Sequence, residues 1–149
     1  MGYYVEMVTC VTIPKKNINA CLNAINELHT DKNLLKYAGG GVFPKKGTVA
    51  EYAWYSWVDN PPNGKFENLQ KALLEWRYDN KVDKNGNVII TYFHGEKWGD
   101  DELLFKTIAP FVKNNSTIEV TGEDDNHWRY VFSNKQVKME KGKVVYESD

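Results

Sequence analysis

The sequence is poor in the residues that build reactive or metal-binding centres, with two cysteines and three histidines among 149 residues. Cys10 and Cys21 lack a second cysteine or histidine two to four residues away, so they do not match the spacing of a zinc site. We expect both to be free, buried thiols, although two cysteines also permit one disulfide. His29, His94 and His127 form no recognisable acid–base pair, and no nucleophile elbow is present. The sequence therefore predicts no metal, no cofactor and no catalytic residue.

An excess of charge of one sign and a long apolar run are also missing. Lysine and arginine number 19, aspartate and glutamate number 20, and the net charge is -1. This balance gives no strong signal for binding duplex nucleic acid. No window approaches the ~18 consecutive apolar residues of a membrane span, and the first ten residues lack a basic start followed by an apolar run. We therefore expect a cytoplasmic protein with no membrane partner, whose oligomeric state is left open.

Aromatic residues, by contrast, are abundant. Five tryptophans, nine tyrosines and six phenylalanines make up 13% of the chain. A chain of this length can bury a core without disulfides or a structural metal, so we expect a single domain over residues 1–149. Either its core or a binding face must be rich in aromatic side chains.

The first half of the chain carries alternating and helical hydrophobic patterns in turn. Tyr3–Ile13 alternates with period two, which predicts a strand, and Asn17–His29 has the spacing of an amphipathic helix. A short helix is expected over Asp31–Ala38, between an N-cap residue and a glycine stop. Glu51–Val58 is aromatic on both faces and predicts a strand, and Phe66–Tyr78 resumes helical spacing.

The second half is predicted to be a hairpin, a helix and a run of short strands. Asn85-Gly86 between two strand-like segments is a strong hairpin signal, since both residues tolerate positive φ. A helix capped by Asp100 or Asp101 is expected to end at Ala109, before a proline. Short strands separated by turn residues then predict an antiparallel meander: Ser116–Gly122, His127–Phe132, Gln136–Glu140 and Lys143–Glu147.

This order of elements favours the α+β class, because strands and helices do not alternate strictly. We expect a mostly antiparallel sheet with helices packed on one face. A ferredoxin-like core with extra C-terminal meander strands fits the order best. No internal repeat divides the chain.

The best ligand-binding candidate is a glycine-rich segment followed by aromatic residues. Gly39–Gly47 offers backbone amides, and Lys45 and Lys46 offer cations for a phosphate, although the P-loop pattern is absent. Aromatic residues that could stack on a base follow closely: Tyr52, Trp54, Tyr55 and Trp57. The same aromatic side chains could instead anchor a protein partner, so a nucleotide-like ligand and a protein surface both remain open.

The predicted strand over 127–132 has two different faces. Its aromatic residues share one face, which we expect to be buried beneath helices: Trp128, Tyr130 and Phe132. The open face of the sheet offers polar residues to a ligand: Glu119, Thr121 and Arg129. Arg129 is therefore added to the predicted ligand-binding residues.

Two alternatives to a simple binding protein rest on the last third of the chain. Glu123 to His127 reads as a hairpin loop, but the same cluster could form a weak metal site. A small metal-assisted hydrolase would use His127 with Glu123 or Asp125. A structural or assembly protein would instead self-associate through a strand edge at Lys143–Glu147.

Several segments resemble small uncharacterised proteins of bacteriophages and prophages. They are Tyr55-Ser56-Trp57-Val58-Asp59 before two prolines, Leu74-Glu75-Trp76-Arg77-Tyr78, and Gly122-Glu123-Asp124 followed by Trp128-Arg129-Tyr130-Val131-Phe132. Gly95-Glu96-Lys97-Trp98 is also similar to the ferredoxin-like domain of plasmid and phage proteins of the YubB type. The resemblance implies an accessory protein in the bacterial host cytoplasm, with a counter-defence or host-modulating role. The sequence thus leads to the hypothesis of a non-enzymatic protein that binds a host protein or a small nucleotide-like ligand.

Overall fold

The structure is a computed structural model that describes residues 3–30, 64–99, 101–143 and 145–148. The short helix predicted over Asp31–Ala38 and the aromatic strand predicted over Glu51–Val58 lie outside these residues. None of the described helices is long and apolar enough to cross a membrane.

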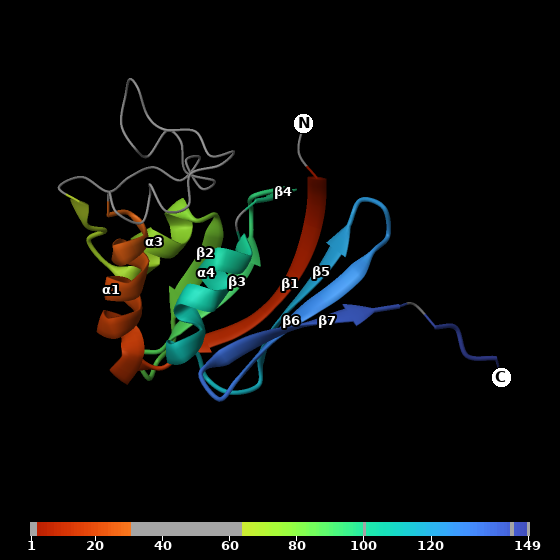
Figure 1. Ribbon diagram of the computed structural model, residues 1–149. Helices are drawn as coiled ribbons and strands as arrows, with labels where there is room; N and C mark the ends of the chain where they lie inside the picture. The colour runs from red at the N-terminus through yellow and green to blue at the C-terminus, as the bar shows by residue number, and fades with distance from the viewer. Residues whose placement is uncertain (1–2, 31–63, 100, 144, 149) are drawn as a thin grey trace, which may run out of the picture.

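The described residues form an antiparallel sheet of seven strands together with three α-helices (Figure 1). The strands are β1 (Tyr3–Ile13), β2 (Tyr78–Val82), β3 (Val88–Phe93), β4 (Lys97–Trp98), β5 (Ser116–Gly122), β6 (His127–Ser133) and β7 (Gln136–Gly142). The helices are α1 (Ile18–Leu28), α3 (Leu69–Glu75) and α4 (Asp101–Ile108), with short 3-10 turns at Lys15–Asn17 and Ala109–Phe111. The prediction of an α+β protein with a mostly antiparallel sheet is confirmed.

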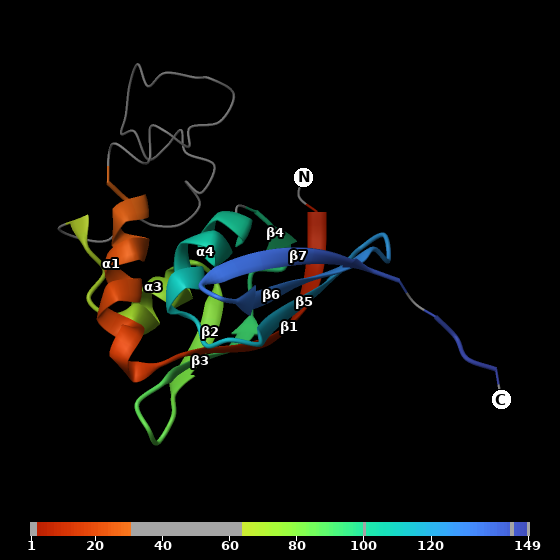
Figure 2. The ribbon, with the colours of Figure 1, turned by 60° about the horizontal axis from the view of Figure 1, so that its bottom comes forward.

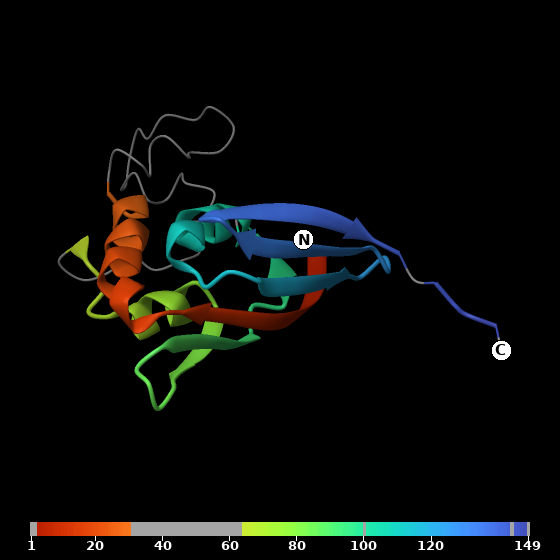
Figure 3. The same ribbon diagram turned by 90° about the horizontal axis from the view of Figure 1, so that it is seen from below.

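Strand β1 is the centre of the sheet. The strand order is β2-β3-β1-β5-β6-β7, and β4 pairs with the first residues of β1. Figure 3 shows the β2–β3 hairpin and the β5–β7 meander on opposite sides of β1. The predicted alternation along β1 is confirmed, because Val11 and Ile13 are fully buried whereas Val8 is 67% exposed. One face of this strand therefore faces the core and the other faces solvent.

The helices bury the apolar stripes that their spacing predicts. Helix α1 buries Cys21, Ile25 and Leu28, and it contacts both α3 and α4. Helix α3 begins after Asn68, whose side chain accepts a hydrogen bond from the Lys71 amide at 2.9 Å, as an N-cap residue does. Figure 2 shows the three helices close together, with β7 passing beside α4.

Aromatic rings fill the core between α4 and the meander. The Phe105 ring of α4 packs edge-on against Tyr130 of β6 at 4.9 Å between ring centroids, and it also contacts Phe132 and Tyr78. Tyr130 and Phe132 are buried as predicted, and Trp128 is half-buried at the margin of this cluster. Aromatic pairs of this kind add to the stability gained from the area they bury.

The predicted Asn85-Gly86 hairpin is confirmed. Gly86 has φ of 85°, and β2 pairs antiparallel with β3. The Asp83 carboxylate accepts hydrogen bonds at 2.9 Å from the amides of Asn85 and Asn87, which holds the turn.

Three predictions need correction. The helix predicted to reach Tyr78 ends at Glu75, because Arg77 adopts the left-handed conformation with φ of 78° and the chain then enters β2. The described residues of 143–147 form no strand, because they extend past the pairing with β6. Cys10, predicted to be buried, is exposed, since it points from β1 to the open face of the sheet.

Candidate functional site

Most of the predicted ligand-binding residues lie outside the described part of the chain. They are Lys45, Lys46, Tyr52, Trp54, Tyr55 and Trp57, and their role stays a prediction. Arg129 is described, and it lies on the open face of β6, directly between Glu119 of β5 and Glu140 of β7. Its Nε donates to the Glu140 carboxylate at 2.7 Å. The positive charge of Arg129 is therefore already paired with a carboxylate.

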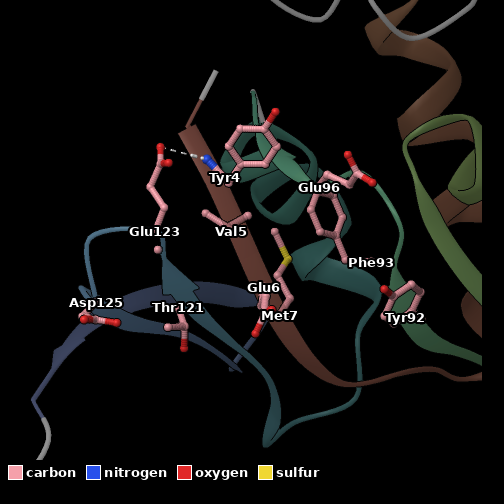
Figure 4. A pocket seen from close by; sticks show the side chains of 11 residues that line it. Tyr4, Val5, Glu6, Met7, Tyr92, Phe93, Glu96, Thr121, Glu123 and Asp125 are labelled. Carbon is pink, nitrogen blue, oxygen red and sulfur yellow. Dashed lines mark hydrogen bonds between the residues drawn. The ribbon is translucent and has the colours of Figure 1, made fainter. Parts of the chain in front are cut away.

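A cavity of about 820 Å³ opens around the N-terminal half of β1. Its walls come from β1, β3, β5 and the turns that follow β3 and β5, and they consist of Tyr4, Val5, Glu6, Met7, Tyr92, Phe93, Glu96, Thr121, Gly122, Glu123 and Asp125. Figure 4 shows Glu123 and Asp125 on one side of β1 and Tyr92 and Glu96 on the other. The cavity thus straddles the central strand of the sheet.

The cavity exists because β3 separates from β1. Asp79 of β2 pairs with Tyr92 and Asn80 pairs with Ile90, so Thr91 is an extra residue in β3. A bulge of this kind bends a strand and redirects the side chains that follow it. The ladder between β1 and β3 accordingly stops at the Val11–Ile90 pair. On that side, residues 5–10 of β1 have no strand partner in the ladders of the described residues.

The bulge also decides which side chain of β3 reaches the cavity. Tyr92 is 58% exposed, whereas its neighbour Phe93 is 4% exposed. Because side chains alternate along a strand, an unbroken β3 would continue the inward series of Val88 and Ile90 at position 92. The extra residue exchanges the two aromatic rings, so that a tyrosine faces the solvent and a phenylalanine joins the core.

The cavity wall is acidic. Four carboxylates line it, those of Glu6, Glu96, Glu123 and Asp125, and no lysine, arginine or histidine is among the lining residues that the structure describes. Tyr4 lies beside them and is 48% exposed. Its backbone amide donates to the Glu123 carboxylate at 3.3 Å (Figure 4). A wall of carboxylates with exposed tyrosines attracts cations that carry apolar surface.

The backbone of Glu96 is held in an unusual conformation. Its φ is 63°, in the left-handed region that few residues other than glycine, asparagine and aspartate adopt. The Val5 amide donates to the Glu96 carbonyl at 2.8 Å, which ties the turn after β3 to β1. Such conformations cluster at functional sites, where the surrounding structure enforces them.

A buried ion pair between Arg77 and Asp101 holds the turn that follows β3. Asp101 of α4 is fully buried and accepts hydrogen bonds from the Arg77 guanidinium at 3.2 Å and from the Tyr78 hydroxyl at 2.9 Å. Burial raises the pKa of Asp101, and the Arg77 charge opposes that rise. The Arg77 guanidinium also lies over the Phe93 ring, 5.1 Å from its centroid. The network therefore positions the segment that carries Glu96.

On the β5 side of the cavity, the wall is positioned by Tyr3 and Gly122. Tyr3 donates from its hydroxyl to the Asp124 carboxylate, and this hydrogen bond lowers the pKa of Asp124. The Tyr3 ring lies directly against Gly122, where a Cβ would stand 1.7 Å from the hydroxyl oxygen. The turn between β5 and β6 therefore takes its position from β1. This agrees with the hairpin loop predicted for 123–127.

The alternative hydrolase residues are arranged differently from the hypothesis. His127 Nδ1 lies 3.2 Å from the Thr121 hydroxyl, and no hydrogen bond in the described residues joins it to Glu123 or Asp125. The described part of the chain contains no group of three histidine, cysteine or acidic side chains that could hold a metal ion. The hydrolase alternative stays a prediction.

Sequence reasoning found only part of this site. Among the lining residues, it identified Thr121 as a polar residue of the open face. It did not find Tyr92 or Glu96, because their positions depend on the bulge at Thr91 and on the turn that β1 holds. The one available signal was the odd spacing of the inward residues Val88, Ile90 and Phe93, which a regular strand does not have.

No protein family, curated protein or solved structure matches this chain. Function is therefore inferred from the geometry of the described residues, and no residue role is transferred from another protein.

Proposed function

We propose that this protein is a non-enzymatic binding module that takes a basic segment of a partner protein into the acidic cavity around β1. The observation that carries the proposal is the wall of four carboxylates, Glu6, Glu96, Glu123 and Asp125, with no cationic side chain among the described lining residues. Lysine or arginine side chains entering the cavity would relieve the repulsion between these carboxylates.

Exposed tyrosines give the same surface its apolar contacts. Tyr4 and Tyr92 both line the cavity and are about half exposed, at 48% and 58%. Tyrosine is enriched among the residues that dominate protein interfaces, because it buries a large ring and still forms a hydrogen bond. Val8, 67% exposed on the same face of β1 as Tyr4 and Glu6, extends this surface.

The origin and finer fold of the protein belong to the same proposal. The likeness of the sequence to phage and prophage proteins supports an accessory protein that acts on a host protein in the bacterial cytoplasm, in counter-defence or host modulation. The order β2-β3-β1-β5 is all antiparallel, with α1 between β1 and β2 and α4 between β3 and β5. This order supports a ferredoxin-like core with its helices on one face and β6 and β7 appended.

The acidic wall also separates two ligand classes. A nucleotide phosphate would be repelled by the carboxylates, so the cavity favours a protein partner over a nucleotide. The phosphate-binding role predicted for Lys45 and Lys46 concerns residues outside the described part of the chain and stays a prediction.

Nuclear magnetic resonance titration with two peptides of equal length tests the proposal. One peptide alternates lysine or arginine with leucine, and the other has glutamate at the basic positions. We expect only the basic peptide to shift the amide resonances of Tyr4, Glu6 and Tyr92, with an affinity that falls as salt is added.

A matched pair of variants localises the binding. Glu6→Gln together with Glu123→Gln should weaken the basic peptide roughly tenfold by removing two attractive charges from the cavity. Glu75→Gln removes an exposed carboxylate of α3 outside the cavity and should leave the affinity unchanged. Equal binding of the acidic peptide, or an equal loss in the Glu75 variant, would contradict the proposal.

A further inference from the structure

A second hollow, of about 370 Å³, lies on the other side of the sheet, beside the start of α4. Trp128 and Lys141 line it, and they alternate with Arg129 and Glu140, which face the open side. Strand β7 passes beside α4 (Figure 2), and the hollow is lined by Glu102 of α4 and by Met139 and Lys141 of β7.

Aromatic rings form the base of this hollow. Trp98 of β4 is perpendicular to Trp128 of β6, at 87° with 5.6 Å between ring centroids, and it is stacked on Tyr130 at 6.1 Å. Both tryptophans are half-buried, so part of each ring remains open to the hollow. Helix α4 covers the aromatic face of β6 at Tyr130 and Phe132 but leaves Trp128 at the margin. Flat aromatic molecules stack on surfaces of this kind.

The charges around the rings are unequal. Glu102 already has two partners, because one carboxylate oxygen lies 3.0 Å from the Lys106 ammonium and the other accepts from the Tyr130 hydroxyl at 3.1 Å. Lys141 is exposed and forms no ion pair within the described residues. It stands directly opposite Trp128 in the β6–β7 ladder, where facing side chains come within contact distance. The unbalanced charge beside the open ring is therefore positive.

We infer that this hollow binds a small planar aromatic molecule with an anionic group, stacked on the tryptophans and paired with Lys141. Phosphate and carboxylate both satisfy the anionic part, so a nucleotide and an aromatic acid share the required chemistry. The inference is independent of the proposed protein-binding function, because none of the four carboxylates of the first cavity lines this hollow.

Binding is measured by calorimetry and by the indole N–H resonances of Trp98 and Trp128. Adenosine 5′-monophosphate and 4-hydroxybenzoate are the probes, and adenosine, inorganic phosphate and choline are the comparison compounds. We expect at least one probe to bind and to shift both indole signals, more strongly than adenosine or phosphate alone. The stronger of the two probes identifies the preferred anion.

Two lysine variants on the same strand provide the decisive comparison. Lys141→Gln should weaken the bound probe roughly tenfold, since one charge-assisted contact is lost, and should leave adenosine unaffected. Lys138→Gln makes the same change in charge at an exposed residue of β7 that faces the open side, and it should have no effect. Both positions are exposed, so neither variant threatens folding.

Three results would overturn the inference. The first is that neither probe shifts the indole signals. The second is that the two lysine variants lose affinity equally. The third is that choline binds, and binds more tightly after Lys141→Gln. The last result would assign the hollow to organic cations instead.

Discussion

The two faces of the central strands differ in composition and in exposure to solvent. On β1, Val5, Val11 and Ile13 are buried, while Tyr4 and Val8 on the opposite face are about half to two-thirds exposed. On β6, Tyr130 and Phe132 are buried, while Arg129 forms an exposed ion pair with Glu140. The same alternation therefore buries one face in the core and leaves the other exposed to solvent.

The buried and the exposed face meet at one place in β3. At the bulge in β3, Tyr92 and Phe93 are neighbours in sequence but belong to different faces. A break in the regular strand is thus what opens the acidic cavity. Part of β1 is left without a strand partner there, because the ladder between β1 and β3 ends early.

The largest expected loss of stability comes from removing an aromatic ring of α4 that packs on the buried face of the sheet. Phe105 is fully buried among four aromatic rings, so Phe105→Ala should lower the free energy of unfolding by about 3–5 kcal/mol. Tyr92→Ala on the open face should change it by no more than about 0.5 kcal/mol. Urea unfolding measures both, and equal losses would remove the distinction between the faces.

The dependence of stability on pH tests the burial of Cys21. Burial raises the pKa of the Cys21 thiol from 9.0 to about 12, whereas Cys10 is exposed. The unfolded state therefore releases this proton first as the pH rises. Stability should be unaffected below pH 9 and should then fall towards pH 12, by about 1.4 kcal/mol per pH unit from this group.

Variants isolate that contribution from the other groups that titrate in alkali. Cys21→Ala should reduce the slope of stability against pH between 9 and 12, and Cys10→Ala should keep it. Urea unfolding at several pH values in this window provides the measurement. An unchanged slope in the Cys21 variant would mean that the thiol is not protected by burial in solution.

A smaller loss of stability is expected from replacing Gly122, which lies against the Tyr3 ring in one wall of the cavity. In Gly122→Ala the new Cβ would stand 1.7 Å from the Tyr3 hydroxyl oxygen, so the ring must move and its bond to Asp124 is lost. We expect a loss of about 1–3 kcal/mol by thermal or urea unfolding. Gly142→Ala is the matched control, because its Cβ would meet only ordinary contacts at 3.5 Å.

The smallest effect is expected on the open face. Glu140→Gln removes the partner of Arg129 from an exposed ion pair and should cost at most about 1 kcal/mol. Addition of salt should diminish the difference from the unmodified protein. A loss as large as that of Phe105→Ala would show that this face also carries stability.

Much of the fold could be predicted from local patterns. The alternation of Tyr3–Ile13, the spacing within 18–28 and the Asn85-Gly86 turn each describe contacts between residues close in sequence. The end of α3 was placed three residues too late, because the left-handed Arg77 is held by contacts with Asp101 and Gly95 further along the chain. The candidate site was found least well, since Tyr92 and Glu96 reach it through long-range pairing.

The sequence by itself determined the class of fold, the identity of most strands, the alternation along β1 and which face of β6 would be buried. These follow from side-chain periodicity, which is a local property of the chain. Only the tertiary structure decided that β3 carries an extra residue, that β1 lacks a partner beside it and that four distant carboxylates share one cavity. The physical reason is that register and strand separation depend on pairing between residues far apart in sequence, where no local pattern records them.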